Sequence, residues 1–184
     1  MSSTRLSPNL WITAGFAALL EQGPTALKAE SLARKLNTTK GSFYWHFKDV
    51  PDFHRSMLEQ WERWALTEIS EVLDSNSEVV QKIRCLSQIM TGKSSKDADI
   101  SKLEPAIRAW SHDDCAVAEA VARVDELRMS QLFSVLSEKG LSNPELSRII
   151  YAANIGMAEL SRHDGAVNEE ALGTLVDLIL ALYK

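Results

Sequence analysis

Polar and basic side chains are concentrated in the segment from residue 40 to residue 48. Ammonium and hydroxyl groups bind phosphate oxygens, and a lysine can also reach O6 and N7 of guanine in the major groove. The residues with such groups are Lys40, Ser42, Tyr44, His46 and Lys48. They suit hydrogen bonding to a nucleic acid.

Two short helices joined by a tight turn would position these side chains. A helix-turn-helix unit needs a small residue where the helices approach, a turn residue that tolerates the left-handed conformation, and apolar residues facing inward. Ala33 and Asn37 meet the first two needs, and Thr38 or Thr39 can cap the second helix. The inward apolar residues are Leu32, Leu36, Phe43 and Phe47. The polar side chains then lie on the outer or flanking faces, free for a groove.

The rest of the chain also predicts helices. No segment alternates apolar and polar residues between Asn-Gly or Asp-Gly turns, so no sheet is expected. Ser7, Asp113-Asp114 and Asn143 can cap helices, and Gly140 can end one. We therefore expect an all-α protein of about nine helices. Their ranges are about 8–22, 28–36, 39–46, 52–73, 78–90, 100 or 102 to 112, 115–139, 144–161 and 169–183.

The charge is unevenly distributed along the 184 residues. The net charge is -5, which by itself argues against nucleic-acid binding. Residues 1–56 hold seven basic and four acidic side chains, a balance of +3, while the remainder holds 13 basic and 21 acidic ones, a balance of -8. A basic segment joined to an acidic remainder is common when only the basic segment binds an anionic polymer. The alternative explanation is an ordinary chance difference in net charge between two parts of a protein.

The segment LARKLNTTKGSFYWHFK, from Leu32 to Lys48, resembles the helix-turn-helix of the TetR family of bacterial transcriptional regulators. The similarity extends to the first helix, with Ala14 and Gly23, and more weakly to two later runs, 104–110 and 124–128. The resemblance implies a three-helix DNA-binding domain at 1–50 and a larger helical domain for ligand binding and dimerisation at 51–184.

The resemblance also implies roles for individual residues. Tyr44 corresponds to a phosphate-contacting tyrosine of the family, and Lys40 should lie near base edges. Val50 stands where family members often carry a lysine, and Ala29 lies where they usually carry a threonine, so Lys48 and Lys28 would bind DNA in their place. The expected DNA-binding residues are Lys28, Thr39, Lys40, Gly41, Ser42, Tyr44, His46 and Lys48.

Three aromatic residues of this segment have a second interpretation. Tyr44 and Trp45 could pack on the surface of the small domain, and this is the favoured interpretation for Trp45. His46 could instead interact with the dipole at its helix end.

The acidic remainder of the chain is expected to form a homodimer through the last two helices, about 144–161 and 169–183. Their apolar stripes are Leu146, Ile149, Ile150, Ala153, Met157 and Leu160 on one, and Leu172, Leu175, Val176, Ile179 and Leu182 on the other. The stripes could also face only their own subunit's core. By resemblance, two subunits would bind a palindromic operator in double-stranded DNA as a repressor, and an unidentified small molecule would release it.

A ligand pocket would lie among the middle helices, although such aromatic stripes usually form core. Its candidate residues are Trp61, Trp64, Met90, Trp110, Met129 and Phe133. Arg108 and Asp125 are better candidates for an internal ion pair than for ligand binding. A member of the same fold that binds DNA or protein without small-molecule control is the alternative function.

An enzyme is the main rival class. The sequence has no G-x-S-x-G, no glycine-rich phosphate loop, no C-x-x-C and no H-E-x-x-H, and Glu159 with His163 is too little for a di-iron site. We therefore expect no enzyme, no metal and no cofactor. Cys85 and Cys115 suit reduced thiols in a cytoplasm, and the apolar run 10–20 is too short to span a membrane.

Overall fold

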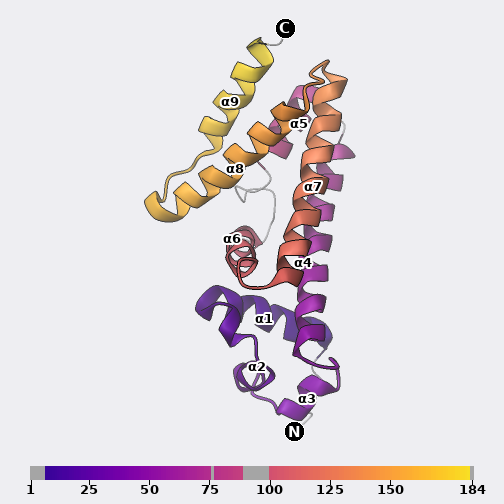
Figure 1. Cartoon of the computed structure of the whole chain (residues 1–184), viewed down its shortest axis with the longest axis vertical. Helices are drawn as coiled ribbons and strands as arrows, with labels where there is room; N and C mark the ends of the chain where they lie inside the picture. The colour runs from indigo at the N-terminus through magenta and orange to yellow at the C-terminus, as the bar shows by residue number, and fades with distance from the viewer. Residues whose placement is uncertain (1–6, 76, 89–99, 183–184) are drawn as a thin grey trace. The chain divides into compact units, whose positions relative to one another are not determined.

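The computed structural model describes residues 7–75, 77–88 and 100–182, without the side chains of 100–102. Within these residues every regular element is helical, so the predicted all-α class is confirmed (Figure 1). The helices are α1 (Pro8–Gln22), the 3-10 turn η1 (Pro24–Ala26), α2 (Ala29–Lys35), α3 (Lys40–Tyr44), α4 (Val50–Leu73), α5 (Val79–Ser87), α6 (Ile100–Trp110), α7 (Cys115–Glu138), α8 (Pro144–Asp164) and α9 (Glu169–Leu182).

Local capping explains most of these boundaries. The Ser7 hydroxyl accepts a hydrogen bond from the Leu10 amide, and the Asn143 side chain accepts one from the Glu145 amide. Asp114 Oδ1 accepts a bond from the Ala116 amide at 3.0 Å and so begins α7. Gly140, at φ 87°, follows the end of the same helix.

Helix α4 begins two residues earlier than the sequence pattern predicts. Asp49 Oδ1 accepts a hydrogen bond from the Asp52 amide at 2.8 Å, so Asp49 is the capping residue. Pro51 then lies in the first turn of the helix, where its missing N–H would have no helical partner in any case. A proline therefore does not mark the boundary here, because the capping residue precedes it.

The chain divides into two compact units. The first comprises Met1–Arg63 and Ala106–Ala120, and the second comprises Trp64–Pro105 and Val121–Lys184. Helices α4, α6 and α7 each contribute residues to both. The predicted domain boundary at residues 50 and 51 lies at the start of α4 and stays a prediction.

An aromatic cluster forms the core of the first unit. Phe43 of α3 is fully buried, and its ring centroid lies 5.4 Å from that of Trp11 in α1 and 5.3 Å from that of Phe53 in α4. Phe47 lies 5.2 Å from Phe43 and 5.0 Å from Phe53. These edge-on and tilted contacts fix α3 against the two longer helices. Phe43 and Phe47 therefore point inward, as predicted.

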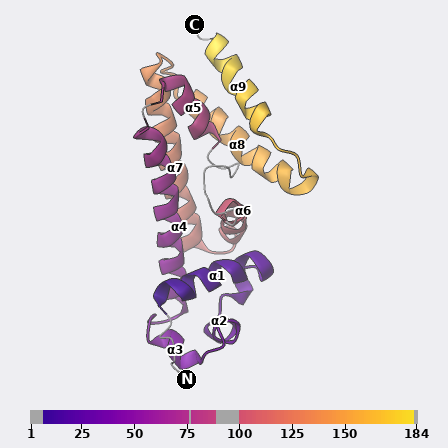
Figure 2. The same cartoon turned by 180° about the vertical axis from the view of Figure 1, so that it is seen from behind.

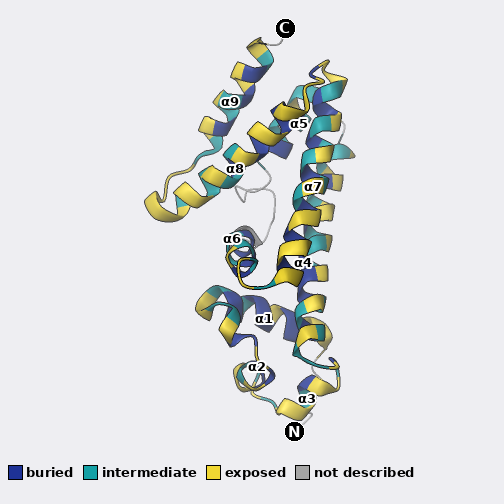
Figure 3. Ribbon diagram, in the orientation of Figure 1, coloured by how far each residue is buried: buried dark blue, intermediate teal, exposed yellow. Residues whose placement is uncertain are grey.

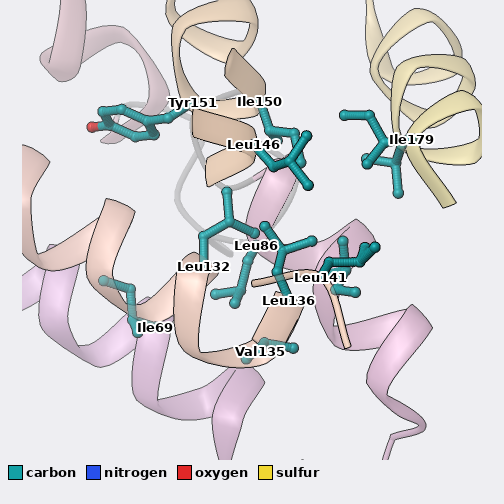
Figure 4. Close-up of a cluster of buried hydrophobic side chains, with 12 residues drawn as sticks. Ile69, Leu86, Leu132, Val135, Leu136, Leu141, Leu146, Ile150, Tyr151 and Ile179 are labelled. Atoms are coloured by element: carbon teal, nitrogen blue, oxygen red, sulfur yellow. The ribbon is translucent and has the colours of Figure 1, made fainter. Parts of the chain in front are cut away.

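An aliphatic cluster forms the core of the second unit. Figure 4 shows Leu132 and Leu136 of α7 facing Leu146 and Ile150 of α8, with Ile179 of α9 alongside. From behind, α5 lies beside α8 and α9, which themselves pack together (Figure 2). The Arg84 side chain of α5 pairs with Asp177 of α9 and contributes to this packing.

Candidate nucleic-acid interface

The turn between α2 and α3 is a Schellman motif centred on Asn37. Asn37 has φ 50°, a left-handed conformation that asparagine tolerates better than most residues. The Thr38 amide donates to the Ala33 carbonyl at 2.9 Å, and the Asn37 amide donates to the Arg34 carbonyl at 3.1 Å. These are the two bonds that close such a helix end. The predicted roles of Ala33, which is buried, and of Asn37 are thus confirmed.

Helix α3 starts at a side-chain cap. The Thr39 hydroxyl accepts a hydrogen bond from the Ser42 amide at 3.3 Å, which selects Thr39 over Thr38 as the capping residue. The helix itself is shorter than the predicted 39–46. The backbone nevertheless continues one more turn, because the His46 and Phe47 amides both donate to the Phe43 carbonyl, at 3.0 and 3.1 Å.

The predicted DNA-binding residues are accessible along this unit (Figure 3). Ser42 and His46 are half-buried. The exposed members are Lys28, Thr39, Lys40, Gly41, Tyr44 and Lys48. Seven of the eight residues lie between positions 39 and 48, and Lys28 is the residue just before α2. Their contacts with DNA stay predictions.

Within residues 7–56, the acidic side chains pair with some of the bases. Glu21 lies 2.6 Å from Lys35, Glu30 lies 3.6 Å from Arg34, and Asp52 lies 3.4 Å from Arg55. Asp49 instead caps α4. The bases of residues 7–56 that form no ion pair within the described part of the chain are Lys28, Lys40 and Lys48. The excess positive charge of residues 7–56 is therefore concentrated on the three lysines that the sequence pattern predicts as DNA contacts.

The structure places two residues of this unit in environments that the sequence did not predict. Trp45, expected to pack on the domain surface, is instead 83% exposed, so that interpretation is wrong. His54 of α4 brings Nε2 to 3.2 Å from the Leu27 carbonyl, and its ring lies 4.9 Å from that of Trp110. No motif in the sequence marks the exposure of Trp45 or the contacts of His54.

The environment of His54 favours the neutral imidazole. Burial lowers the pKa of His54, while its hydrogen bond to the Leu27 carbonyl and the charge of Asp114 act in the opposite direction. The net shift is downward. His54 therefore joins α4 to Leu27, two residues before the start of α2, without a buried charge.

The candidate ligand residues are divided between the two units. Trp61 and Trp110 are buried in the first unit. Trp64, Met129 and Phe133 are half-buried in the second, and Met90 lies outside the described residues. A pocket formed by all of them stays a prediction.

A buried polar cluster lies in the second unit. Arg128 Nη1 of α7 donates to Glu104 Oε1 of α6 at 3.0 Å, and their side chains are only 6% and 8% exposed. Tyr151 of α8 donates its hydroxyl hydrogen to Asp125 Oδ1 at 2.8 Å. Burial alone would lower the pKa of Arg128, but the charge of Glu104 and the contacts with Tyr151 outweigh it and raise the pKa. The cluster draws on both later runs of the family pattern, 104–110 and 124–128, and the pair expected there, Arg108 with Asp125, stays a prediction.

The Glu68 carboxyl of α4 is another group with a shifted pKa in the same unit. Burial raises the pKa of Glu68; the charge of Arg128 lowers it, and the nearby Glu104 and Glu71 raise it further. In the described part of the chain no three of His, Cys, Asp and Glu are grouped closely enough to hold a metal ion.

The apolar stripes of α8 and α9 are each split by the fold. Leu146 and Ile150 of α8 are buried, as are Leu172, Val176 and Ile179 of α9, so this half belongs to the chain's own core. The exposed members of the stripes are Ile149, Leu160 and Leu182, and Leu178 of α9, which lies outside the predicted stripe, is also exposed. The prediction that whole stripes form an interface was therefore too broad.

No described helix is both long and apolar enough to cross a membrane.

Comparison with known proteins identifies this arrangement. Residues 12–49 match the family profile of the bacterial regulatory proteins, tetR family. The fold is similar to that of a transcriptional regulator from Rhodococcus sp. Rha1, with a TM-score of 0.76, 18% identity, and 97% of this chain and 96% of the other covered. It is also similar to SmeT, the repressor of the Stenotrophomonas maltophilia multidrug efflux pump SmeDEF, with a TM-score of 0.70, 17% identity, and 99% and 92% covered.

A similar curated protein is the nucleoid occlusion factor SlmA of Vibrio campbellii. It is 21% identical over 154 residues, which cover 80% of this chain and 78% of the other.

Proposed function

Since the chain belongs to the TetR family of bacterial regulatory proteins, we propose that it binds a palindromic operator as a homodimer and represses transcription until a small molecule releases it. The family and the fold support the general function of a DNA-binding transcriptional regulator. The proposal adds the operator symmetry, the dimer and the effector.

The distribution of charge is the observation that carries this proposal. Lys28, Lys40 and Lys48 form no ion pairs within the described residues, and Lys40 and Lys48 lie on either side of the exposed Tyr44 in the sequence. Unpaired lysines near a phosphate backbone release counterions on binding and so strengthen the association. An overall charge of -5 does not oppose this contact, because the acidic excess lies outside residues 1–56.

Selection of DNA fragments by the purified protein tests the proposal directly. Fragments retained from a pool of genomic DNA should share a palindrome, because two symmetric subunits read two half-sites about one or more helical turns apart. A shared site without two-fold symmetry would contradict the dimeric arrangement. No enrichment at all from a folded protein would contradict DNA binding.

Variants at the phosphate-contacting positions test the docking. With about four phosphate contacts per subunit, the slope of log K against log salt should be near ~-7 for a dimer, and Lys48→Ala should reduce its magnitude by about 2. Tyr44→Phe, which removes only the hydroxyl, should weaken binding with little change in this slope. Lys139→Ala, an exposed lysine outside the first unit, is the matched control. Equal affinities for Lys48→Ala and Lys139→Ala would contradict the docking.

The exposed halves of α8 and α9 support the proposed dimer. Leu178 lies on the exposed side of α9, so Leu178→Glu should leave the fold intact and yield a monomer near 20.5 kDa in sedimentation. Leu66→Glu, at an exposed leucine of α4, is the control and should still sediment as a dimer. A wild-type monomer at micromolar concentration would contradict the dimer, and a Leu178→Glu dimer would contradict this interface.

Control by a small molecule rests on the aromatic residues of the middle helices. SmeT, the structurally similar protein, is a repressor of an efflux pump, and the same mode of action is proposed for this chain in the cytoplasm. A compound that raises the melting temperature of the free protein and lowers its affinity for the selected DNA would support the effector. Trp110→Ala should weaken the response to that compound, and an unchanged response would contradict the assigned pocket.

A second candidate is DNA binding without a small-molecule effector. The similarity to a nucleoid occlusion factor favours it, because that protein's name refers to the nucleoid rather than to an effector. Many enriched sites dispersed over the genome, with no compound that changes affinity, would favour this second function.

A further inference from the structure

The peptide that joins Leu27 to Lys28 is held at both ends. Its N–H, which belongs to Lys28, donates to the Ala26 carbonyl at 2.8 Å. This bond closes an inverse γ-turn, because Leu27 has φ -77° and ψ 53°. The carbonyl of the same peptide, which belongs to Leu27, lies 3.2 Å from Nε2 of His54 in α4. One local and one long-range hydrogen bond therefore fix the orientation of this peptide.

The Leu27 carbonyl depends on His54 for its hydrogen bond. Leu27 is only 1% exposed, and within the described part of the chain no other donor bonds to its carbonyl. Because a carbonyl oxygen can only accept, the hydrogen of this bond is on Nε2 of the imidazole. The edge-on contact with Trp110, with ring centroids 4.9 Å apart and planes at 89°, restrains the imidazole ring. His54 is thus held in an orientation in which it donates to Leu27.

His54 directly follows the residue that fixes the other helix of the motif. Phe53 of α4 packs against Phe43 of α3, with ring centroids 5.3 Å apart, and against Phe47, with centroids 5.0 Å apart. His54 makes the corresponding contact with the chain just before α2. Two consecutive residues of α4 therefore position both helices of the helix-turn-helix, one by aromatic packing and the other by a hydrogen bond.

Lys28 is the residue that this anchored peptide presents to solvent. It precedes the first residue of α2, with φ -113° and ψ 141°, and its side chain makes no capping hydrogen bond. The side chain is exposed and forms no ion pair within the described residues. A lysine is a point charge on a flexible stem, so the position of its main chain decides which phosphate the ammonium group can reach.

We propose that His54 is a positioning residue for DNA binding, whose bond to the Leu27 carbonyl holds the main chain of Lys28 where the ammonium group meets a phosphate of duplex DNA. His54 acts through Lys28, because its own Nε2 is engaged by the Leu27 carbonyl and its ring by Trp110. This inference rests on the proposed DNA-binding function and adds a residue outside the predicted contact surface.

The salt dependence of binding by single and double variants tests this coupling. The probe is a duplex that the wild-type protein selects from a random-sequence pool, with log K measured between about 50 and 200 mM salt. Lys28→Ala removes one phosphate contact per subunit, so the magnitude of the slope should fall by about 2 for a dimer. His54→Leu should reduce the slope by a similar amount. The double variant should lose no more than either single variant, because both substitutions remove the same contact.

Conservative variants separate positioning from a general loss of structure. His54→Gln places an amide N–H near the position of Nε2 and should restore the wild-type affinity and slope, whereas the shorter side chain of His54→Asn should not. Lys48→Ala, at a predicted contact that His54 does not hold, should lower the slope by about a further 2 in the His54→Leu background. Circular dichroism and the melting temperature report whether each variant is folded. If His54→Leu does not fold, His54→Asn replaces it in the double variants.

The outcomes separate the inference from the function on which it rests. A folded His54→Leu protein with the wild-type slope overturns the inference alone, as does a double variant whose slope falls by the sum of the two single losses. His54→Gln that binds no better than His54→Leu also overturns it. An unchanged slope for Lys28→Ala does the same, since Lys28 then meets no phosphate. A wild-type protein that retains no duplex overturns the proposed DNA binding itself.

Discussion

Replacing Glu104 by glutamine removes the anion from a buried ion pair and leaves the Arg128 guanidinium in place. The two side chains are 8% and 6% exposed, and Nη1 and Oε1 are 3.0 Å apart. At that distance the Coulomb attraction is about 5.5 kcal/mol for an effective dielectric constant near 20, compared with about 1.4 kcal/mol in water. The Nε atom of Arg128 is buried with no hydrogen-bond partner among the described residues, so the guanidinium has little compensation beyond Glu104 and the Tyr151 hydroxyl at 3.5 Å.

The expected loss of stability follows from this burial. Removing one partner of a buried pair costs about 3–5 kcal/mol, and we expect about 3 kcal/mol for Glu104→Gln because glutamine can still accept a hydrogen bond. For a chain of 184 residues this corresponds to a decrease in melting temperature of about 6–12 °C. Differential scanning calorimetry at fixed protein concentration measures the shift.

An exposed ion pair of the same chemistry is the matched control. Glu30 and Arg34 in α2 lie 3.6 Å apart with side chains 74% and 78% exposed, so Glu30→Gln should cost no more than about 0.5 kcal/mol. Adding Arg128→Met to Glu104→Gln should restore part of the stability, because the isolated buried charge is then removed. Equal small shifts for both Glu→Gln variants, or a double variant less stable than Glu104→Gln, would refute the reasoning.

Three shorter predictions concern the first unit. Gly15→Ala places a methyl carbon 2.6 Å from Phe53 Cζ and 2.7 Å from Met57 Sδ, so overpacking of about 1–3 kcal/mol should exceed the helix-propensity gain of about 1 kcal/mol, and a higher midpoint in urea denaturation would contradict this. The lowered pKa of His54 means that the unfolded state takes up a proton first, so wild type should lose stability as the pH falls below about 6.5. His54→Gln should lack that loss, and identical pH profiles of melting temperature would exclude the effect. Asn37→Val should destabilise the unit by more than about 1 kcal/mol because a β-branched residue resists φ 50°, whereas Asn37→Gly should not; equal melting temperatures would contradict it.

Helix caps and the turn before α3 depend on neighbouring residues and can be predicted from residue order alone. Ser7, Thr39, Asp114 and Asn143 cap helices through bonds to amides two or three residues away, and Asn37 closes α2 through its own backbone conformation. Such contacts join residues that are close in the sequence, so a pattern of residue types predicts them. The helix-turn-helix is built from them, which is why its residues can be selected without knowledge of the fold.

Contacts between residues far apart in the sequence become visible only in the folded chain. It paired Glu104 with Arg128 across 24 positions, and it buried Leu146 while leaving Ile149 exposed on the same helix. Periodicity marks both leucine and isoleucine as apolar, but only the neighbouring helices define which side of a broad stripe they cover. Trp45 is the clearest case, since its exposure follows from the rotation of α3 around the buried Phe43 and from no property of tryptophan itself.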